Sequence, residues 1–122
     1  MKGITKIISI TVLCIMLVCV SFAQSSHSAT LTWTLSTDSG SGYNAYRLAG
    51  ACPSSATTGQ GTKLTSTPLA AGTVTFTDAN LAVGTYCYYV TAVLNGAESV
   101  PSNLAPAVVL PQSPSALSVT VK

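Results

Sequence analysis

Ionisable side chains are scarce in this chain of 122 residues. Lysine and arginine together number five, aspartate and glutamate three, and there is a single histidine, so charged residues make up only 7% of the sequence. A catalytic site needs several ionisable groups that converge in space. Here Asp38, Asp78, Glu98 and His27 are far apart in the sequence, and the three acids fall in predicted loops or strand ends. We therefore expect no catalytic residues.

Motifs of reaction chemistry are missing as well. The sequence has no Gly-x-Ser-x-Gly, no glycine-rich phosphate loop, no Cys-x-x-Cys and no cluster of metal-ligating side chains. The segment at residues 78–80 superficially resembles the start of a calcium loop, but the later ligands are lacking. We predict instead that Asp78 caps the turn before Leu81. The sequence thus predicts a protein that is not an enzyme and that holds no cofactor or metal.

The first 23 residues have the pattern of a signal peptide. Lys2 and Lys6 precede an apolar run over residues 7–20, and Ser-Phe-Ala follows at 21–23, which favours cleavage after Ala23. A membrane span needs about 20 apolar residues, and this run is shorter. The alternative of an uncleaved signal anchor is therefore disfavoured. We expect the remainder to be secreted or at the cell surface, extracellular or periplasmic, with no stable membrane insertion after cleavage.

Cleavage also removes the net positive charge. Lys2 and Lys6 leave with the signal peptide, so three bases and three acids remain and the formal charge changes from +2 to zero. A neutral surface rich in serine and threonine gives no electrostatic support for nucleic acid or an anionic membrane as a partner. An unknown protein or polysaccharide at the cell surface is the partner class that we expect.

The four cysteines divide in the same way. Cys14 and Cys19 belong to the signal peptide, whereas Cys52 and Cys87 remain. An even number of cysteines in an exported domain predicts a disulfide, with two free thiols as the alternative. A Cys52–Cys87 bond would close a loop of about 36 residues and stabilise the domain by about 3–4 kcal/mol in the chain-entropy model.

Helical periodicity is absent after the signal peptide, and two-residue alternation takes its place. Asn95-Gly96 is a strong hairpin signal because a type I′ turn needs positive φ at both central positions. Short strands with turn residues between them indicate an antiparallel β-sandwich or barrel, and we favour a sandwich. The predicted strands cover residues 28–36, 43–48, 62–66, 73–78, 81–93 and 101–110.

A tail follows the last of these strands. Residues 111–114, Pro-Gln-Ser-Pro, are predicted to be a linker, and residues 115–122 alternate as one more strand would. There is little room for a strand before residue 28 once the signal peptide is removed. The tail could therefore supply a missing strand, within the chain or from a neighbouring molecule, or it could be a loosely held terminus.

Several of these segments in order resemble a fibronectin type III domain, most closely the bacterial extracellular kind. They are Leu-Thr-Trp at 31–33, Gly-Tyr-Asn-Ala-Tyr-Arg at 42–47, Phe-Thr-Asp at 76–78, residues 81–93 and Pro-Ser-Asn at 101–103. The resemblance covers about residues 28–110 of a domain that we place at 24–110. It implies an all-β, antiparallel, immunoglobulin-like β-sandwich of seven strands, or of six strands plus the tail.

The resemblance also assigns structural roles. Trp33 would be a core residue, and Leu81, Gly84 and Tyr86 would build a tyrosine corner, in which the hydroxyl bonds back to the upstream backbone. An immunoglobulin domain instead has its first cysteine before the tryptophan, which is not the order here. Because Cys87 directly follows Tyr86, strand alternation turns it away from the core. A Cys52–Cys87 bond would then clamp the outside of one sheet.

Two tyrosines are the remaining candidates for a binding site. Tyr46 and Tyr89 are predicted on the outer face of one sheet, where exposed rings could stack on sugars or meet a protein, or could form an ordinary cross-strand pair. We therefore expect a secreted, non-catalytic binding, adhesion or spacer module of fibronectin type III type. The alternatives are a carbohydrate-associated surface module and an assembly subunit that exchanges its terminal strand.

Overall fold

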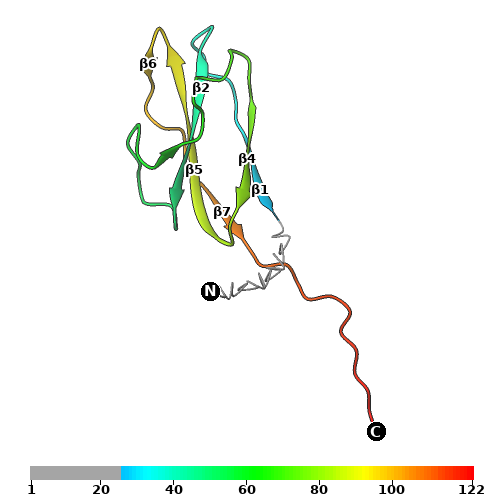
Figure 1. Ribbon diagram of the computed structural model, residues 1–122. Coiled ribbons are helices and arrows are strands. Elements are labelled where there is room, and N and C mark those ends of the chain that lie inside the picture. The colour runs from blue at the N-terminus through cyan, green and yellow to red at the C-terminus, as the bar shows by residue number, and fades with distance from the viewer. Residues whose placement is uncertain (1–25) are drawn as a thin grey trace, which may run out of the picture.

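The computed structural model describes residues 26–122, so the predicted signal peptide and its two cysteines lie outside the described part. Within residues 26–122 no helix is long and apolar enough to cross a membrane. The described chain is built from strands and loops (Figure 1). The strands are β1 (His27–Thr32), β2 (Gly42–Ala49), β3 (Thr62–Lys63), β4 (Thr75–Leu81), β5 (Gly84–Leu94), β6 (Ala97–Glu98) and β7 (Ala105–Val109).

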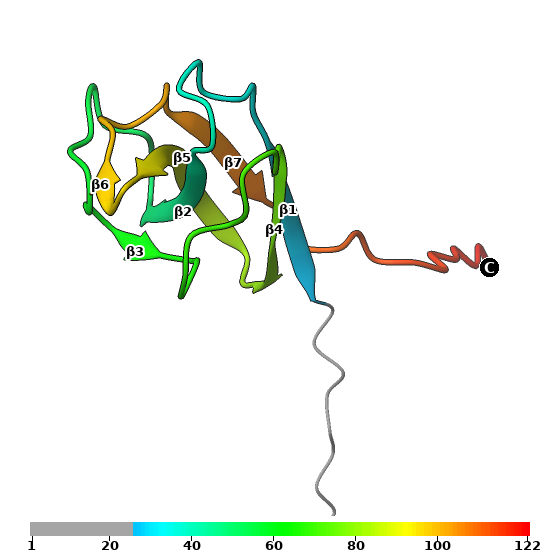
Figure 2. The same cartoon turned by 90° about the horizontal axis from the view of Figure 1, so that it is seen from above.

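These strands form two antiparallel sheets. One is the pair β1–β4, and the other has the order β3-β2-β5-β6, with β7 also paired to β5. Seen from above, β1 and β4 form one layer and the remaining strands form the other (Figure 2). This arrangement is consistent with a β-sandwich and confirms the prediction of an all-β, antiparallel fold.

The core lies between the two sheets and is centred on the ladder of β2 and β5. Alternation directs Tyr43 and Ala45 of β2 and Val90 of β5 inward, where they form a buried cluster. The Trp33 ring packs against Tyr43 with ring centroids 5.6 Å apart. Further apolar side chains that pack on this cluster are only partly buried: Leu31, Leu64, Leu69, Phe76 and Ala92.

Two predicted turns are present as expected. Asn95 and Gly96 join β5 to β6 with φ angles of 53° and 80°, as the hairpin signal requires. Where β4 leads into β5, the Tyr86 hydroxyl donates a hydrogen bond of 3.0 Å to the backbone carbonyl of Ala82. Leu81 is buried beside it, and the Tyr86 ring lies 3.7 Å from the position that a Cβ on Gly84 would occupy. The predicted hydroxyl-to-backbone bond of the corner is confirmed.

The chain from residue 95 onward is less regular than predicted. Regular pairing of the last strand covers only Ala105–Val109, because Pro101 interrupts the approach to β5. Two serine hydroxyls replace strand carbonyls there: Ser102 Oγ accepts from the Val90 N–H, and Ser99 Oγ accepts from the Ala92 N–H. Other boundaries move by a few residues, since Leu81 ends β4 as the partner of His27 and β5 begins at Gly84.

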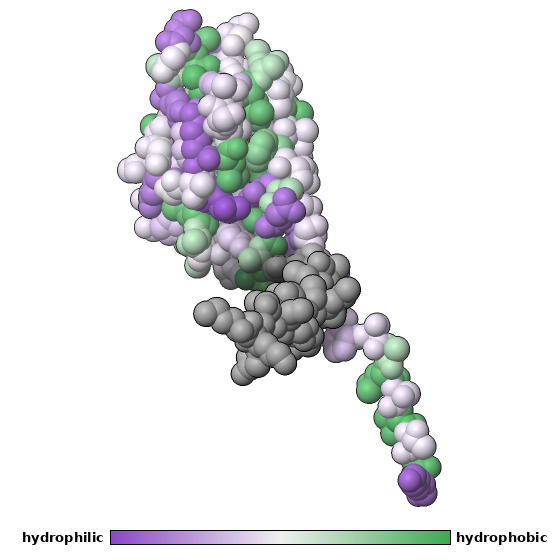
Figure 3. Space-filling view, in the orientation of Figure 1, coloured by the Kyte–Doolittle hydropathy of each residue, from purple (hydrophilic) through white to green (hydrophobic). Residues whose placement is uncertain are grey.

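The predicted strand at residues 115–122 pairs with nothing in this structure. The tail leaves β7 and extends away from the domain (Figures 1 and 2). Its apolar side chains are almost fully exposed, with Leu117 at 93%, Val119 at 81% and Val121 at 88% of their free area. Figure 3 shows hydrophobic residues alternating with paler, more polar ones along it.

Asp78 does not cap the turn, contrary to the prediction. Its position in β4 directs the carboxylate into the space between the sheets, where Oδ2 accepts hydrogen bonds from Arg47 at 2.8 Å and from the Tyr88 hydroxyl at 2.9 Å. The Arg47 guanidinium also lies 5.5 Å from the centre of the Tyr86 ring. Because Arg47 and Tyr88 belong to the other sheet, this ion pair ties the two sheets together. Burial, reinforced by the bond to Asp78, raises the pKa of Tyr88 above its ordinary value.

Candidate functional site

The predicted aromatic face is present but is not open to a ligand. Tyr46 and Tyr89 are cross-strand partners on the outer face of the β2–β5 ladder, with ring centroids 4.8 Å apart and planes within 7° of parallel. Tyr46 is 4% exposed and Tyr89 is 1% exposed. The rings are therefore not exposed, and of the two alternatives the ordinary cross-strand pair is the one present.

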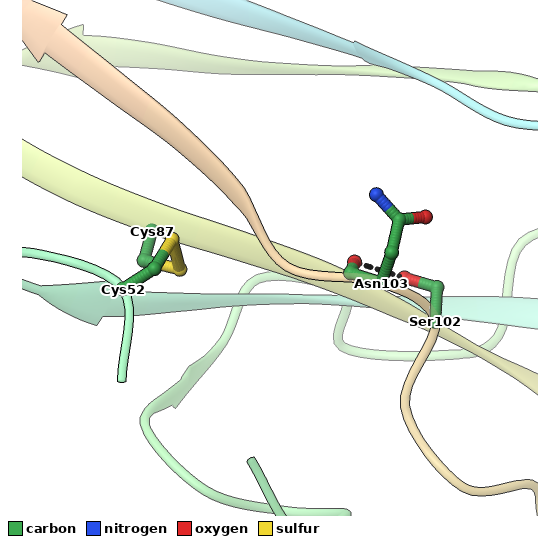
Figure 4. Close-up of a disulfide and its surroundings, with 4 residues drawn as sticks. All are labelled: Cys52, Cys87, Ser102 and Asn103. Atoms are coloured by element: carbon green, nitrogen blue, oxygen red, sulfur yellow. Dashed lines mark hydrogen bonds between the residues drawn. A yellow bond between two sulfur atoms is a disulfide. The ribbon is translucent and has the colours of Figure 1, made fainter. Parts of the chain in front are cut away.

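The cover comes from the long loop at residues 50–61, between β2 and β3. The Tyr89 hydroxyl donates to the backbone carbonyls of Thr57 at 3.2 Å and Gln60 at 2.7 Å, both in this loop. The loop is also tied to β5 by the Cys52–Cys87 disulfide (Figure 4). Cys87 points to the outer face, as its place next to Tyr86 predicted, and is fully buried under the loop. The predicted disulfide is present.

A network of hydrogen bonds completes this outer face. Glu98 of β6 accepts from the Asn44 amide through Oε1, and from the hydroxyls of Tyr46 at 2.8 Å and Thr91 at 3.1 Å through Oε2. Burial alone would raise the pKa of Glu98, but these bonds and the charge of Lys63 at 3.7 Å outweigh it and lower the pKa. Burial and the bond to Glu98 raise the pKa of Tyr46 to about 12. The network commits Asn44, Tyr46, Thr91 and Glu98 to one another.

The opposite side of the molecule has an open groove between the edges of the two sheets. β1 pairs with β4 along one edge only, and its other edge pairs with no strand among residues 26–122. The N–H of Trp33 bonds to the Val74 carbonyl at 3.0 Å, so strand alternation turns the backbone groups of Thr32 and Thr30 toward the open edge. Unpaired groups of this kind are a template for pairing with another strand.

The groove is large enough to hold a segment of chain. Residues 29–34 form one side and residues 102–107 the other, with Tyr88, Tyr89 and Val90 also contributing, and the enclosed volume is about 580 Å³. A second hollow of about 200 Å³ shares Trp33 and Val90 and extends the groove toward Val100. The volume of the groove, about 580 Å³, falls in the range of sites that bind ligands.

The floor of the groove is a part of the core that lacks cover. Leu31 and Trp33 pack on the core cluster but are only partly buried. The Trp33 indole Nε1 is buried and is the one such side-chain atom in the described chain without a hydrogen-bond partner. A buried donor without a partner is costly, since it has lost its bonds to water.

The far side of the groove is small and polar. Ala105 and Ala107 line it from β7, so their methyl groups leave room for larger side chains to enter. Asn103 lines it from the segment before β7, and its amide points away from β5 (Figure 4). The Ser102 hydroxyl donates a hydrogen bond of 2.9 Å to the Asn103 carbonyl. The wall thus offers apolar contact and one amide that is free to bond a backbone.

The described residues contain no group of three or more side chains that could hold a metal ion. His27 lies at the start of β1, and the carboxylates of Asp78 and Glu98 are both committed to structural bonds. Comparison of the chain with protein-family models and with curated proteins gives no match.

The sequence identified residues that come together on the outer face but not the loop that covers them. Tyr46 and Tyr89 do come together, and so do Cys52 and Cys87; the two tyrosines and Cys87 are buried, and Cys52 is part of the loop itself. The groove was not predicted as a site. The related signal in the sequence was the prediction that there is little room for a strand before residue 28.

Proposed function

We propose that this chain is an exported, non-catalytic binding module whose binding site is the groove, and that its ligand is an extended peptide strand. The observation that carries the proposal is the free edge of β1 above a half-buried Trp33 whose indole N–H has no partner. An extended segment could pair with β1 through backbone hydrogen bonds and place alternate side chains into the core. Both needs of the groove are then met by one ligand.

We also propose that the fold is a fibronectin type III sandwich without its first strand. The pairing of the strands supports this. In such a sandwich β1 would be the second strand and β4 the fifth. In the other sheet β2 would be the third strand, β5 the sixth, and β6 and β7, which both pair with β5, together the seventh. The bond from Tyr86 to Ala82 fits the tyrosine corner of such sandwiches. The vacant place would then belong to a strand beside β1.

Catalysis and sugar binding have less support. The scarce ionisable groups do not converge, as the bonds of Asp78 and Glu98 illustrate. A carbohydrate site would use exposed aromatic rings, and the stacked pair Tyr46 and Tyr89 is covered by the loop. A binding or adhesion module that recognises a strand is the function that these contacts favour.

Selection from a random decapeptide library tests the proposal. The exported chain, residues 24–122, would be immobilised at low density, and we expect enriched peptides in which apolar residues alternate with polar ones. Their binding should shift the fluorescence of Trp33, which is the only tryptophan in the chain. Peptides without alternation, or binding that leaves Trp33 fluorescence unchanged, would contradict the proposal.

A variant of the edge supplies the control. In Thr30→Pro the ring removes an N–H that faces the groove and not β4, so binding of the selected peptides should fall at least about tenfold. Ser28→Pro is not equivalent, because it falls within the irregular pairing between His27 and Ala29. Thr77→Ala on β4 is the matched control: it lies across from Thr30 and is exposed, but does not line the groove.

A further inference from the structure

We propose that the strand that fills the groove is the tail of a second copy of this chain, residues 115–122. This inference depends on the proposed function, since it names the ligand of the same groove. It would make the protein a self-assembling subunit in which each copy donates a strand and accepts one.

The tail has the side chains that the groove requires. Leu117, Val119 and Val121 alternate with polar residues, so in an extended strand all three point to one side. β1 directs three residues toward the core in the same way: Ala29, Leu31 and Trp33. A tail paired beside β1 would therefore place three apolar side chains next to three others, over the part of the core that is uncovered.

Both partners also lack the features that normally prevent strand addition. Free edges in natural proteins are commonly protected by proline, lysine or bulges. β1 contains no proline or lysine, and its one irregularity lies at its start, between His27 and Ala29. The tail contains no proline after Pro114, and its single charged side chain is Lys122 at the end. Three apolar side chains exposed together in solution are themselves a liability that docking would remove.

The path of the chain favours a second copy over the tail's own domain. β1 begins and β7 ends at the same end of the molecule (Figure 1). A strand that pairs antiparallel to β1, as β4 does, must enter from the opposite end, near Trp33, whereas a parallel strand would have to reverse direction directly after β7. Residues 110–114 reach at most about 20 Å, about the length of the groove edge itself, so the linker would have to occupy the groove before the strand could turn back. In the structure the tail instead extends away from its own domain (Figure 2).

Such an interface is heterologous, because the donor surface and the acceptor surface are different. Heterologous contacts build open chains unless the geometry closes them. We therefore expect a concentration-dependent series of oligomers, starting with the dimer. If two copies exchanged their tails reciprocally, assembly would stop at the dimer. In that case too, the strand in each groove would come from the second copy.

The test compares two neighbouring positions in the tail. Val119→Asp places a charge on the side that would enter the core, whereas Thr120→Asp makes the same change on the opposite side. Both residues are exposed and lie outside the strands, so the domain itself should fold equally well in both. In multi-angle light scattering of the exported chain, Val119→Asp should raise the concentration of half-assembly by roughly a hundredfold or more, because it would bury an unpaired charge. Thr120→Asp should change it by no more than about twofold.

A peptide then locates the contact. The synthetic decapeptide of residues 113–122, titrated into the full-length Val119→Asp chain, should give a saturable blue shift of Trp33 fluorescence. The same peptide with aspartate at position 119 should give none. Hydrogen exchange at the amides of Thr30 and Thr32 should slow in parallel with the shift.

The remaining outcomes overturn the inference and separate it from the proposed function. A wild-type chain that stays monomeric with slow exchange at Thr30 and Thr32 has filled the groove from within its own chain, by its tail. Library peptides that bind the groove while the decapeptide does not would leave the proposed function standing and exclude the tail. If neither binds and no oligomer forms, both proposals fail.

Discussion

The two faces of the larger sheet are completed in opposite ways. On its outer face the chain supplies its own cover, a loop held by the Cys52–Cys87 disulfide, and the tyrosine pair beneath it is almost fully buried. On its inner face the core borders an open groove, where Leu31 and Trp33 of the smaller sheet's side are only partly buried. The same sheet thus has one closed face and one that is incomplete at its margin.

The polar atoms of the two faces differ in the same sense. The Tyr89 hydroxyl reaches two loop carbonyls and Glu98 accepts bonds from three side chains, whereas the Trp33 N–H has no partner. A fold that satisfies so many buried groups on one face has the means to do so on the other. Under the proposed function, the groove is left for another strand to complete. Loss of packing should therefore cost more on the outer face than in the groove.

Truncation of one residue on each face gives the largest difference. Tyr89→Ala should lower the free energy of unfolding by about 3–5 kcal/mol, because it removes a buried aromatic ring and leaves a cavity. Leu31→Ala should lower the free energy of unfolding by less than about 2 kcal/mol, which is the smallest loss typical of a fully buried leucine. Urea unfolding at low protein concentration measures both. Equal costs would mean that the groove is already filled in the monomer.

Repeating these unfolding measurements at several protein concentrations gives a sharper comparison of the two faces. If a second copy fills the groove, the native state gains stability as the concentration rises, by mass action. The cost of Leu31→Ala should then grow with concentration, while the cost of Tyr89→Ala stays constant. A cost of Leu31→Ala that is the same at every concentration would count against strand exchange.

Removal of the clamp is expected to have the next largest effect. The double variant Cys52→Ser/Cys87→Ser should lose about 3–4 kcal/mol, because the unfolded chain is no longer restricted by a loop of about 36 residues. The loop should also exchange its amide hydrogens faster, whereas exchange at β1 should not change. The double variant is preferable to single ones because it leaves no free thiol. A loss under about 1 kcal/mol would show that the hydrogen bonds of Tyr89 hold the loop without the disulfide.

The two faces were not equally predictable from the sequence. Alternation and turn residues located most strands, and Asn95-Gly96 fixed one hairpin, since these are local signals. The outward direction of Cys87 followed from its place beside Tyr86. Burial of Tyr46 and Tyr89 could not be predicted, because it depends on the path of a glycine- and serine-rich loop that has no periodicity of its own.

The long-range hydrogen-bond partners of polar side chains also could not be predicted from the sequence. Asp78 was expected to cap a turn, but it bonds to Arg47 and Tyr88, which lie 31 residues before it and 10 after it. Glu98 collects donors from residues as distant as Asn44. Spacing along the chain carries no information on such contacts, since they arise only when the sheets face one another. The lack of room for a strand between Ala23 and residue 28 is, in contrast, a local feature of the sequence and stays a prediction.

Acid should weaken the outer face through Glu98. Its pKa is lowered in the folded protein, so its contribution to stability is complete above the unfolded value of about 4.3 and is lost as the pH falls from there through the lowered pKa. Glu98→Gln should cost about 1.5–3 kcal/mol at pH 7, where bonds to a charged group are lost. The gap between wild type and variant should close in acid. Unfolding curves at several pH values measure it, and a gap that is constant down to pH 3 would contradict the lowered pKa.

The smallest effects come from removing one polar atom on each face. Tyr89→Phe deletes the hydroxyl that bonds two loop carbonyls and should cost about 1 kcal/mol. Trp33→Phe deletes an N–H that is buried without a partner, and this gain should offset part of the lost ring contact, so the monomer should change by less than about 1 kcal/mol. Circular dichroism follows unfolding in both variants, since Trp33→Phe removes the fluorescent probe. A loss for Trp33→Phe well above that of Tyr89→Phe at low concentration would mean that the indole N–H is bonded in solution. The groove would then be occupied before a second copy arrives, and the contrast between the two faces would disappear.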